Sequence, residues 1–492
     1  MRRRDFLSLP ALPAFVRGSS AACGAAPADG QRPTALAPAD ARFEAIAAVV
    51  RQKMRDHGVP GVGLGVMAEG RPVLRGFGVT QLDDPQPVTA DTLFTIASIS
   101  KTMTATAVMR LAELGAVDLK APIQRYLPGF HVIDPDTSAR VSLWHCLTHT
   151  PGWEGQLTTD DRGADALAHF AATTLATLPQ LAPPGRVWSY NNAGFALAGR
   201  VIEQVTGKSI HEALRELVFT PLRLTHTTTR LTDAITYRLT LGHRDRDGRV
   251  EVIRPFQTTS STTAGGVLTS LADLMRYVAF HLGDGTVAGN GLHISRARLD
   301  EMQTPQLRKL ATSDEMGIGW HLRSVGGVRT LAHGGTLNGH CLLLQLVPSK
   351  QLAFTVLTNH AEGWRLVQEV EAAILKAYAG VALAPGQTIG HRGINEAMTA
   401  HARPIVPQPR LDDYIGTYQR PPVGTVHVRP DAGRLVVATG VGQADAPLAF
   451  YGPDVAYALS GQYPGMPYEF IRDEAGVVRW IRVNGRIAHR MP

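Results

Sequence analysis

One stretch of the chain reads Phe94-Thr95-Ile96-Ala97-Ser98-Ile99-Ser100-Lys101-Thr102 and contains its single Ser-x-x-Lys pattern. If a helix begins here and runs to about Leu114, with Gly115 at its C-cap, Ser98 and Lys101 lie one turn apart on the same face. That places an amine beside a hydroxyl that must lose its proton to attack a carbonyl. Backbone N–H groups at a helix N-terminus also face developing negative charge. The stretch therefore predicts a nucleophile at Ser98.

A second polar cluster, Tyr190-Asn191-Asn192, follows a Pro-Pro-Gly loop at 183–185 and precedes a predicted helix over 195–205. A phenol held near an amine can shuttle protons between a nucleophile and a leaving group. An Asn two residues further on can hold Lys101 and grip a substrate amide. The tripeptide alone would be explained equally well by a Tyr packed at a helix start.

The third element is His333-Gly334-Gly335-Thr336, directly after a predicted strand over 330–332. Glycines such as Gly335 let a substrate lie against a strand edge. The Thr336 N–H can form an oxyanion-binding pair with the N–H of Ser98. A second His-x-Gly, at 391–393, lies where no strand pattern supports it and is not retained.

The order Ser-x-x-Lys, Tyr-x-Asn, His-x-Gly resembles the serine β-lactamase and penicillin-binding-protein superfamily. Tyr-x-Asn in place of Ser-Asp-Asn resembles its class C branch, with that branch's D-aminopeptidases and esterases. The resemblance covers about residues 40–378. Further stretches that resemble the branch are Leu147-Thr148-His149-Thr150-Pro151-Gly152-Trp153, Ala264-Gly265-Gly266, Gly317-Ile318-Gly319-Trp320 and Leu357-Thr358-Asn359.

The resemblance implies a role for each matching residue. Ser98 attacks the substrate and forms an acyl-enzyme, while Lys101 and Tyr190 act as a coupled base and acid. Which of the two takes the first proton stays open. Asn192 positions Lys101 and the substrate.

His333 lines the pocket in the same comparison, and it marks a departure from class C enzymes. Those enzymes carry a cation at this place, where it helps to bind the β-lactam carboxylate. A histidine at its reference pKa of about 6.5 is mostly neutral near pH 7, which weakens that grip. Efficient β-lactamase activity is therefore not expected.

We expect a serine hydrolase that cleaves small esters or D-amino-acid-containing amides or peptides. The alternatives are a β-lactamase and a penicillin-recognising sensor or scaffold that is acylated without turnover. Two rival hydrolase designs lack their motifs: no Glu follows His145 in the His145/His149 pair, so it is not the zinc motif H-E-x-x-H, and no G-x-S-x-G occurs. No metal or cofactor is expected, Glu154 is expected on the surface, and the oligomeric state stays open.

The composition excludes several other classes. The chain has 492 residues, 44% hydrophobic and 18% charged, so it can bury a core. The net charge is +7, but only seven of the 49 basic residues are Lys and the Arg residues are scattered, so no nucleic-acid partner is expected. No stretch approaches the roughly 20 apolar residues of a transmembrane helix.

Strands early and late in residues 40–379, with helices between them, indicate an α+β fold. The resemblance adds an antiparallel sheet flanked by helices and an all-α lobe. A Pro/Gly-rich linker over 380–410 precedes short alternating strands, which predict a small β-barrel or sandwich over 411–492 that resembles a lipocalin-like appendage. Predicted strands there are 425–429, 435–438, 448–451, 468–472 and 478–483.

The N-terminal stretch Arg3-Arg4-Asp5-Phe6-Leu7 resembles a twin-arginine signal. We expect a signal peptide over 1–28, a leader over 29–39, and a periplasmic or secreted protein; a basic tail is the alternative. Lipid anchoring at Cys23 is not expected, because Ser20 stands where an aliphatic residue belongs. Cys146 and Cys341 can pair, but two buried thiols are favoured.

Overall fold

The structure is a computed structural model that describes residues 40–156, 163–283, 285, 293–308, 314–383, 410–422, 424–438, 445–461 and 464–492. The expected signal peptide and leader lie outside the described residues, as does most of the expected linker. Among the described residues, no helix combines the length and the apolar character that crossing a membrane requires.

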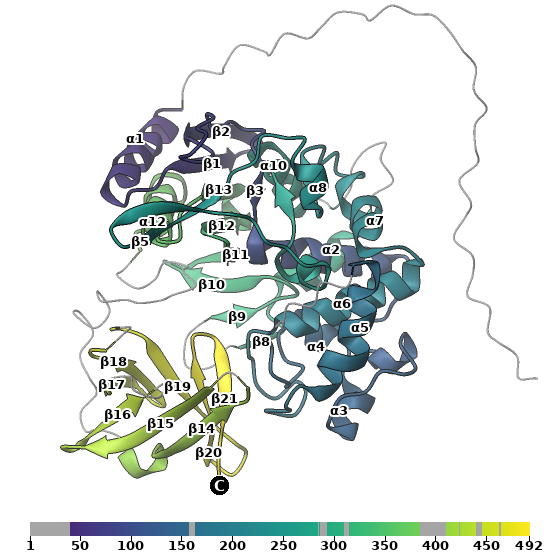
Figure 1. The fold of residues 1–492 in the computed structure, drawn as a ribbon, viewed down its shortest axis with the longest axis vertical. Helices are drawn as coiled ribbons and strands as arrows, with labels where there is room; N and C mark the ends of the chain where they lie inside the picture. The colour runs from purple at the N-terminus through teal and green to yellow at the C-terminus, as the bar shows by residue number, and fades with distance from the viewer. Residues whose placement is uncertain are drawn as a thin grey trace, which may run out of the picture. The chain divides into compact units, whose positions relative to one another are not determined.

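The hydrolase-like part is built on an eight-stranded antiparallel sheet in the order β2-β1-β13-β12-β11-β10-β9-β8 (Figure 1). The first strands pair with the last, because β1 lies beside β13 with Gly63 opposite Leu357. This confirms the α+β expectation. The strands are β1 (Gly61–Ala68), β2 (Arg71–Gly78), β8 (Leu307–Arg308), β9 (Glu315–Met316), β10 (His321–Val325), β11 (Val328–Leu337), β12 (His340–Val347) and β13 (Leu352–Thr358).

Helices cover both faces of this sheet (Figure 1). On one face, α1 (Ala41–Asp56) and α12 (Trp364–Ile374) share an apolar core with Val62, Leu64 and Val66 of β1. On the other face, α10 (Leu271–Leu282) packs closely on β1. A Cβ at Gly63 would lie 3.1 Å from the Leu271 side chain, so the alternation of Val and Gly in β1 sets how near α10 can come.

The helical lobe contains the Ser-x-x-Lys stretch and the Tyr-x-Asn stretch. The predicted helix over 98–114 is an α-helix only from Ser100, because Ser98 lies in a 3-10 turn over Ala97–Ile99. The helices of this region are α2 (Ser100–Glu113), α3 (Pro135–Arg140), α4 (Leu143–Leu147), α5 (Ala166–His169), α6 (Asn192–Thr206), α7 (Ile210–Leu214), α8 (Leu231–Ala234), α9 (Thr262–Gly265) and α11 (Arg296–Gln303). Two small sheets accompany them. One has three strands in the order β3 (Phe94–Thr95), β7 (Leu268–Thr269) and β4 (Thr227–Thr228), and the other pairs β5 (Gly242–Arg246) with β6 (Arg249–Ile253).

The C-terminal part is a closed eight-stranded barrel, which confirms the expected small β-barrel. Its interior is filled by aromatic and aliphatic side chains such as Tyr414, Tyr418 and Phe450. Five of the eight strands were predicted, and β14, β18 and β21, which are four or five residues long, were not. The strands are β14 (Gly416–Arg420), β15 (Gly424–Asp431), β16 (Arg434–Ala438), β17 (Ala446–Gly452), β18 (Val455–Ala458), β19 (Pro467–Arg472), β20 (Val478–Val483) and β21 (Arg486–Arg490).

Candidate active site

Ser98 and Lys101 meet as their spacing predicts. The Lys101 Nζ donates hydrogen bonds to Ser98 Oγ at 3.2 Å and to the Ala264 carbonyl at 2.5 Å. Lys101 is 0% exposed, and this burial lowers its pKa well below the usual value; Arg486 acts in the same direction. A buried amine with a lowered pKa is suited to accept a proton from the hydroxyl beside it.

The second hydrogen-bond acceptor of the Lys101 amine, the Ala264 carbonyl, belongs to α9. No role was predicted for this helix. Helices α2 and α9 are tied together, because Thr104 Oγ1 donates to the Thr263 carbonyl at 2.9 Å. In the sequence, only the Ala264-Gly265-Gly266 stretch pointed to this helix, because it resembles the class C branch. The Ala264 carbonyl thus fixes where the amine lies.

The Tyr-x-Asn stretch is organised by its middle residue. Asn191 caps α6, since its Oδ1 accepts from Gly194 N at 2.8 Å, and its Nδ2 donates to the Trp153 carbonyl at 2.9 Å. Its backbone N–H donates to His149 Nδ1 at 2.9 Å. Asn192 is the first residue of α6, and its Oδ1 is buried with no hydrogen-bond partner in the described parts of the chain.

Tyr190 lies above the Lys101 amine, whose Nζ is 4.9 Å from the ring centroid. Burial raises the pKa of Tyr190 to about 12, while the Ser98 hydroxyl and then Arg486 act in the opposite direction. The structure therefore brings Ser98, Lys101 and Tyr190 together in one buried cluster.

The His-x-Gly stretch lies inside β11, not after a strand that ends at 332 as the sequence suggested. The two adjacent glycines lower the strand signal, which is why the predicted strand was too short. Gly335 is needed for packing: a Cβ there would lie 2.6 Å from the Ile96 carbonyl and 3.1 Å from the Ala97 Cβ. Gly335 therefore lets β11 reach the turn that carries Ser98.

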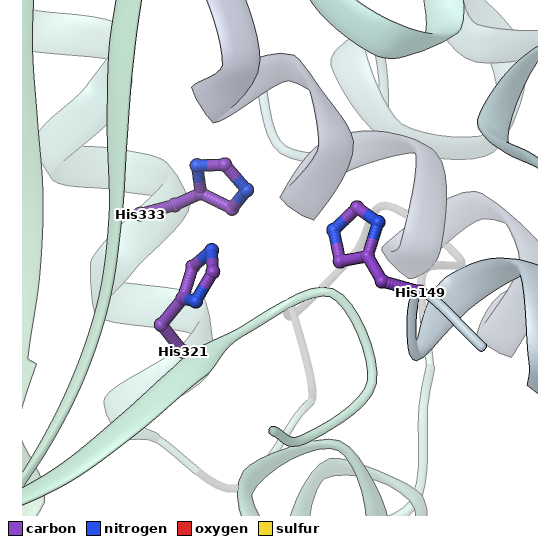
Figure 2. Close-up of side chains that lie close together, drawn as sticks. All are labelled: His149, His321 and His333. Atoms are coloured by element: carbon purple, nitrogen blue, oxygen red, sulfur yellow. The ribbon is translucent and has the colours of Figure 1, made fainter. Parts of the chain in front are cut away.

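Three histidines gather beside Tyr190, and one of them, His321, was not among the predicted site residues. Figure 2 shows the rings of His149, His321 and His333 converging, and one nitrogen of each lies within 4.8 Å of the others. His149 Nδ1 accepts the Asn191 N–H, so a neutral His149 carries its proton on Nε2. His333 Nδ1 lies 2.7 Å from the Gly334 carbonyl and carries the proton of that ring. A metal ion requires a lone pair from every ligand, so the His149 tautomer does not fit a three-histidine metal centre.

Two further expectations are settled by burial. Glu154 was expected on the surface but is 1% exposed, so that expectation is wrong. It faces Arg420 and Arg486 of the barrel, at 3.9 and 3.7 Å, and such a pairing of distant residues leaves no local sequence signal. Cys146 and Cys341 are both buried thiols that form no disulfide, as favoured from the sequence.

Comparison with known proteins identifies the family. Residues 46–379 match the family described as Beta-lactamase, so the chain belongs to the Beta-lactamase family. The chain is 33% identical to penicillin-binding protein 4 of Amycolatopsis lactamdurans over 335 residues, covering 66% of this chain and 87% of that protein.

Two solved structures place the fold. The crystal structure of SurE matches with a TM-score of 0.75 and 26% identity, covering 92% of this chain and 99% of SurE. A class C beta-lactamase matches with a TM-score of 0.60 and 19% identity, covering 68% of this chain and 96% of its own. The likeness to SurE thus extends beyond the hydrolase part alone.

The close approach of β11 to the Ser98 turn gives a first prediction. Gly335→Ala should push the strand away from Ile96, because the new Cβ would lie within 2.6 Å of that carbonyl. A displacement of about 1 Å at a reacting centre lowers kcat/KM by about 10²-fold. Gly129→Ala is the control, since a Cβ there meets nothing within 4 Å. Equal activity of the two variants at equal melting temperature would contradict this role.

Proposed function

We propose that this protein is a serine hydrolase that works through an acyl-enzyme on Ser98 and cleaves small esters or D-amino-acid-containing amides or peptides. The observation that carries the proposal is the buried Lys101 amine, 3.2 Å from the Ser98 hydroxyl. The family assignment supports a hydrolase. SurE, which aligns with most of the chain, has also been crystallised with D-Leu, and this favours substrates with a D-amino acid.

The first half of the reaction forms the acyl-enzyme. Ser98 Oγ attacks the substrate carbonyl carbon while its proton passes to the coupled pair of Lys101 and Tyr190. The tetrahedral intermediate then breaks its bond to the leaving oxygen or nitrogen, which takes the proton from the same pair. The Asn192 Oδ1, a buried acceptor, is suited to hold an N–H group of the substrate.

The geometry of β11 supports Thr336 as an oxyanion donor together with Ser98. Leu337 and His340 flank a two-residue hairpin turn, in which Asn338 and Gly339 have φ angles of +47° and +75°. In an antiparallel pair, successive N–H groups point to opposite edges of the strand. Counting back from the turn directs the Thr336 N–H away from β12, toward an edge that β10 leaves uncovered beyond Ala332.

The second half of the reaction returns the free enzyme. A water molecule gives one proton to the coupled pair and attacks the acyl carbonyl carbon, and Ser98 Oγ leaves and regains a proton. The products are the free acid and unmodified Ser98, so the atoms of the reaction balance. For the cell, the twin-arginine-like start supports a periplasmic or secreted location, which we propose together with this activity.

A fluorophosphonate probe tests the nucleophile. It should label the wild-type protein at Ser98 and leave Ser98→Ala unlabelled. Peptide mass analysis locates the adduct. Ser100→Ala is a useful comparison, because Ser100 is the neighbouring hydroxyl but is buried and accepts the Val267 N–H. Labelling of Ser98→Ala would contradict the assignment. Stable acylation by substrates with no product release would instead identify a sensor or scaffold.

The coupled pair gives the next prediction. Lys101→Ala and Tyr190→Phe should each lower kcat by at least about 10²-fold, the usual scale for a proton-transfer partner. The double variant should lose less than the product of the two single losses, because residues that act as a unit are not additive. Steady-state kinetics on one p-nitrophenyl ester measures all four proteins. Multiplicative losses would show that the two side chains act independently.

Substrate preference is tested with a p-nitrophenyl ester, a D-alanyl amide and nitrocefin. We expect the first two to be preferred, because a fixed cation near the β-lactam carboxylate is worth about 1.5–3 kcal/mol, or roughly 10- to 150-fold, and His333 stands in its place. His333→Lys should shift kcat/KM toward nitrocefin, whereas His321→Lys adds the same charge from β10 as a control. A wild type that prefers nitrocefin tenfold would overturn this interpretation of the pocket.

A further inference from the structure

The barrel contributes backbone contacts to the segment that carries Tyr190. The turn between β20 and β21 contains Gly485, whose carbonyl accepts the Tyr190 N–H at 2.8 Å. One residue before Tyr190, the Ser189 Oγ accepts the N–H of Ile487 at 3.2 Å. Hydrogen bonds from the last hairpin of the barrel therefore fix the backbone of Tyr190, whose phenol we propose to be catalytic.

Side chains strengthen the same contact. The Trp480 Nε1 donates to the Leu181 carbonyl at 2.7 Å, and Arg482 Nη1 donates to the Trp188 carbonyl at 3.0 Å. Around them lies a small apolar cluster whose members come from both parts of the chain: Leu181, Ala182, Val187, Ile471, Trp480 and Ile487. The β20–β21 hairpin is thus packed and buried here, which fixes the direction of the residue after Gly485.

That residue is Arg486, and its guanidinium lies 5.6 Å from the centroid of the Tyr190 ring. Its side chain is 16% exposed, and Nη1 lies 3.7 Å from the Glu154 carboxylate. Glu154 is held in turn, because its Oε2 accepts the Gln156 N–H at 2.6 Å. Arg420 of β14 approaches the same carboxylate at 3.9 Å. A buried counter-ion therefore holds Arg486 beside Tyr190.

The charged and titratable groups around Tyr190 come from several elements. They are Ser98 and Lys101 of the turn and α2, His149 after α4, His321 of β10, His333 of β11, and Arg486 of β21. Among the groups of the described residues that face Tyr190, Arg486 is the one that stays charged at every physiological pH. A permanent positive charge disfavours a protonated amine nearby and favours an ionised phenol.

We propose that Arg486 is a positioning residue for the reaction: the last hairpin of the barrel holds its guanidinium against Tyr190, so that the Lys101–Tyr190 pair is kept ready to take the Ser98 proton. The inference rests on the proposed function of these three residues. It assigns the barrel a part in the chemistry of the active site. The lowering of the Lys101 pKa by Arg486, second only to burial, acts in the expected direction.

The sign of the effect follows from this. The base must be deprotonated to act, so activity falls as pH drops through the pKa of the pair. Removing Arg486 removes a repelling charge from Lys101 and a stabilising charge from the Tyr190 phenolate. Both changes raise the pKa of the pair, so the acid limb of the pH profile moves to higher pH. A charge at about 4–6 Å shifts such a group by about one pH unit or more.

The experiment measures the second-order rate of fluorophosphonate labelling of Ser98 against pH, on the full chain. The variants are Arg486→Ala, Arg486→Lys and the matched control Arg420→Ala, which removes the other cation from Glu154. We expect the acid limb of Arg486→Ala to shift upward by about one unit. Labelling at a pH below the limb then falls about tenfold. Arg486→Lys should restore most of it, and Arg420→Ala should leave the limb in place.

A second variant protects the test against misfolding. Arg486→Ala leaves the buried Glu154 carboxylate with one partner fewer, so the pair Arg486→Gln with Glu154→Gln is made as well. In this pair no buried carboxylate is left without Arg486, and the remaining cation, Arg420, is 23% exposed to water. The limb should shift in the same direction. An unshifted limb in the folded variants overturns the proposal, as does an equal shift in Arg420→Ala. A wild type that is not labelled at Ser98 overturns the proposed function itself, so the two failures are distinguishable.

Discussion

The reaction that we propose for this protein depends on one lysine amine that is buried away from water. A buried ammonium is unfavourable unless it finds partners, and the Lys101 Nζ finds two, the Ser98 hydroxyl and the Ala264 carbonyl. Neither partner is a carboxylate, so no negative charge in contact with the amine offsets the hydration that an ammonium loses on burial. Burial lowers the pKa of Lys101 well below its usual value, and this suits it to the role of base that we propose.

The fold serves this constraint by bringing distant segments to one place. The 3-10 turn before α2 provides Ser98, and α2 itself provides Lys101. The carbonyl that anchors the amine comes from α9, and β11 packs against the Ser98 turn. Because the first strands of the sheet pair with the last, β11 lies beside the Ser98 turn with only Gly335 between the two backbones. The strained φ of +46° at Ala97 lies at the same contact. The packing of β11 and the position of Ser98 therefore depend on the same contact.

The fold class and the three motifs could be predicted from the sequence, because each depends on residues that lie close together in the chain. Ser98 and Lys101 are three residues apart. Tyr190 is followed directly by Asn191, which caps the next helix. The rest depends on tertiary packing. His321 follows the Gly317-Ile318-Gly319-Trp320 stretch, but nothing in that stretch indicates which way its side chain points, and Glu154 looked like any surface acid. Arg486 lies almost 300 residues from Tyr190 and owes its place to a hairpin turn. No spacing rule connects residues that meet only after the barrel has closed.

Glu154 also has a consequence for how such a protein can change over evolutionary time. Its carboxylate belongs to the hydrolase part, while both arginines that face it belong to the barrel. A lineage that exchanged the barrel for an unrelated module would leave a buried anion with neither of its two cations, which costs about 3–5 kcal/mol when one partner of a buried pair is lost. We therefore expect the two parts to be inherited together, and a recombination that separates them to require a replacement of Glu154.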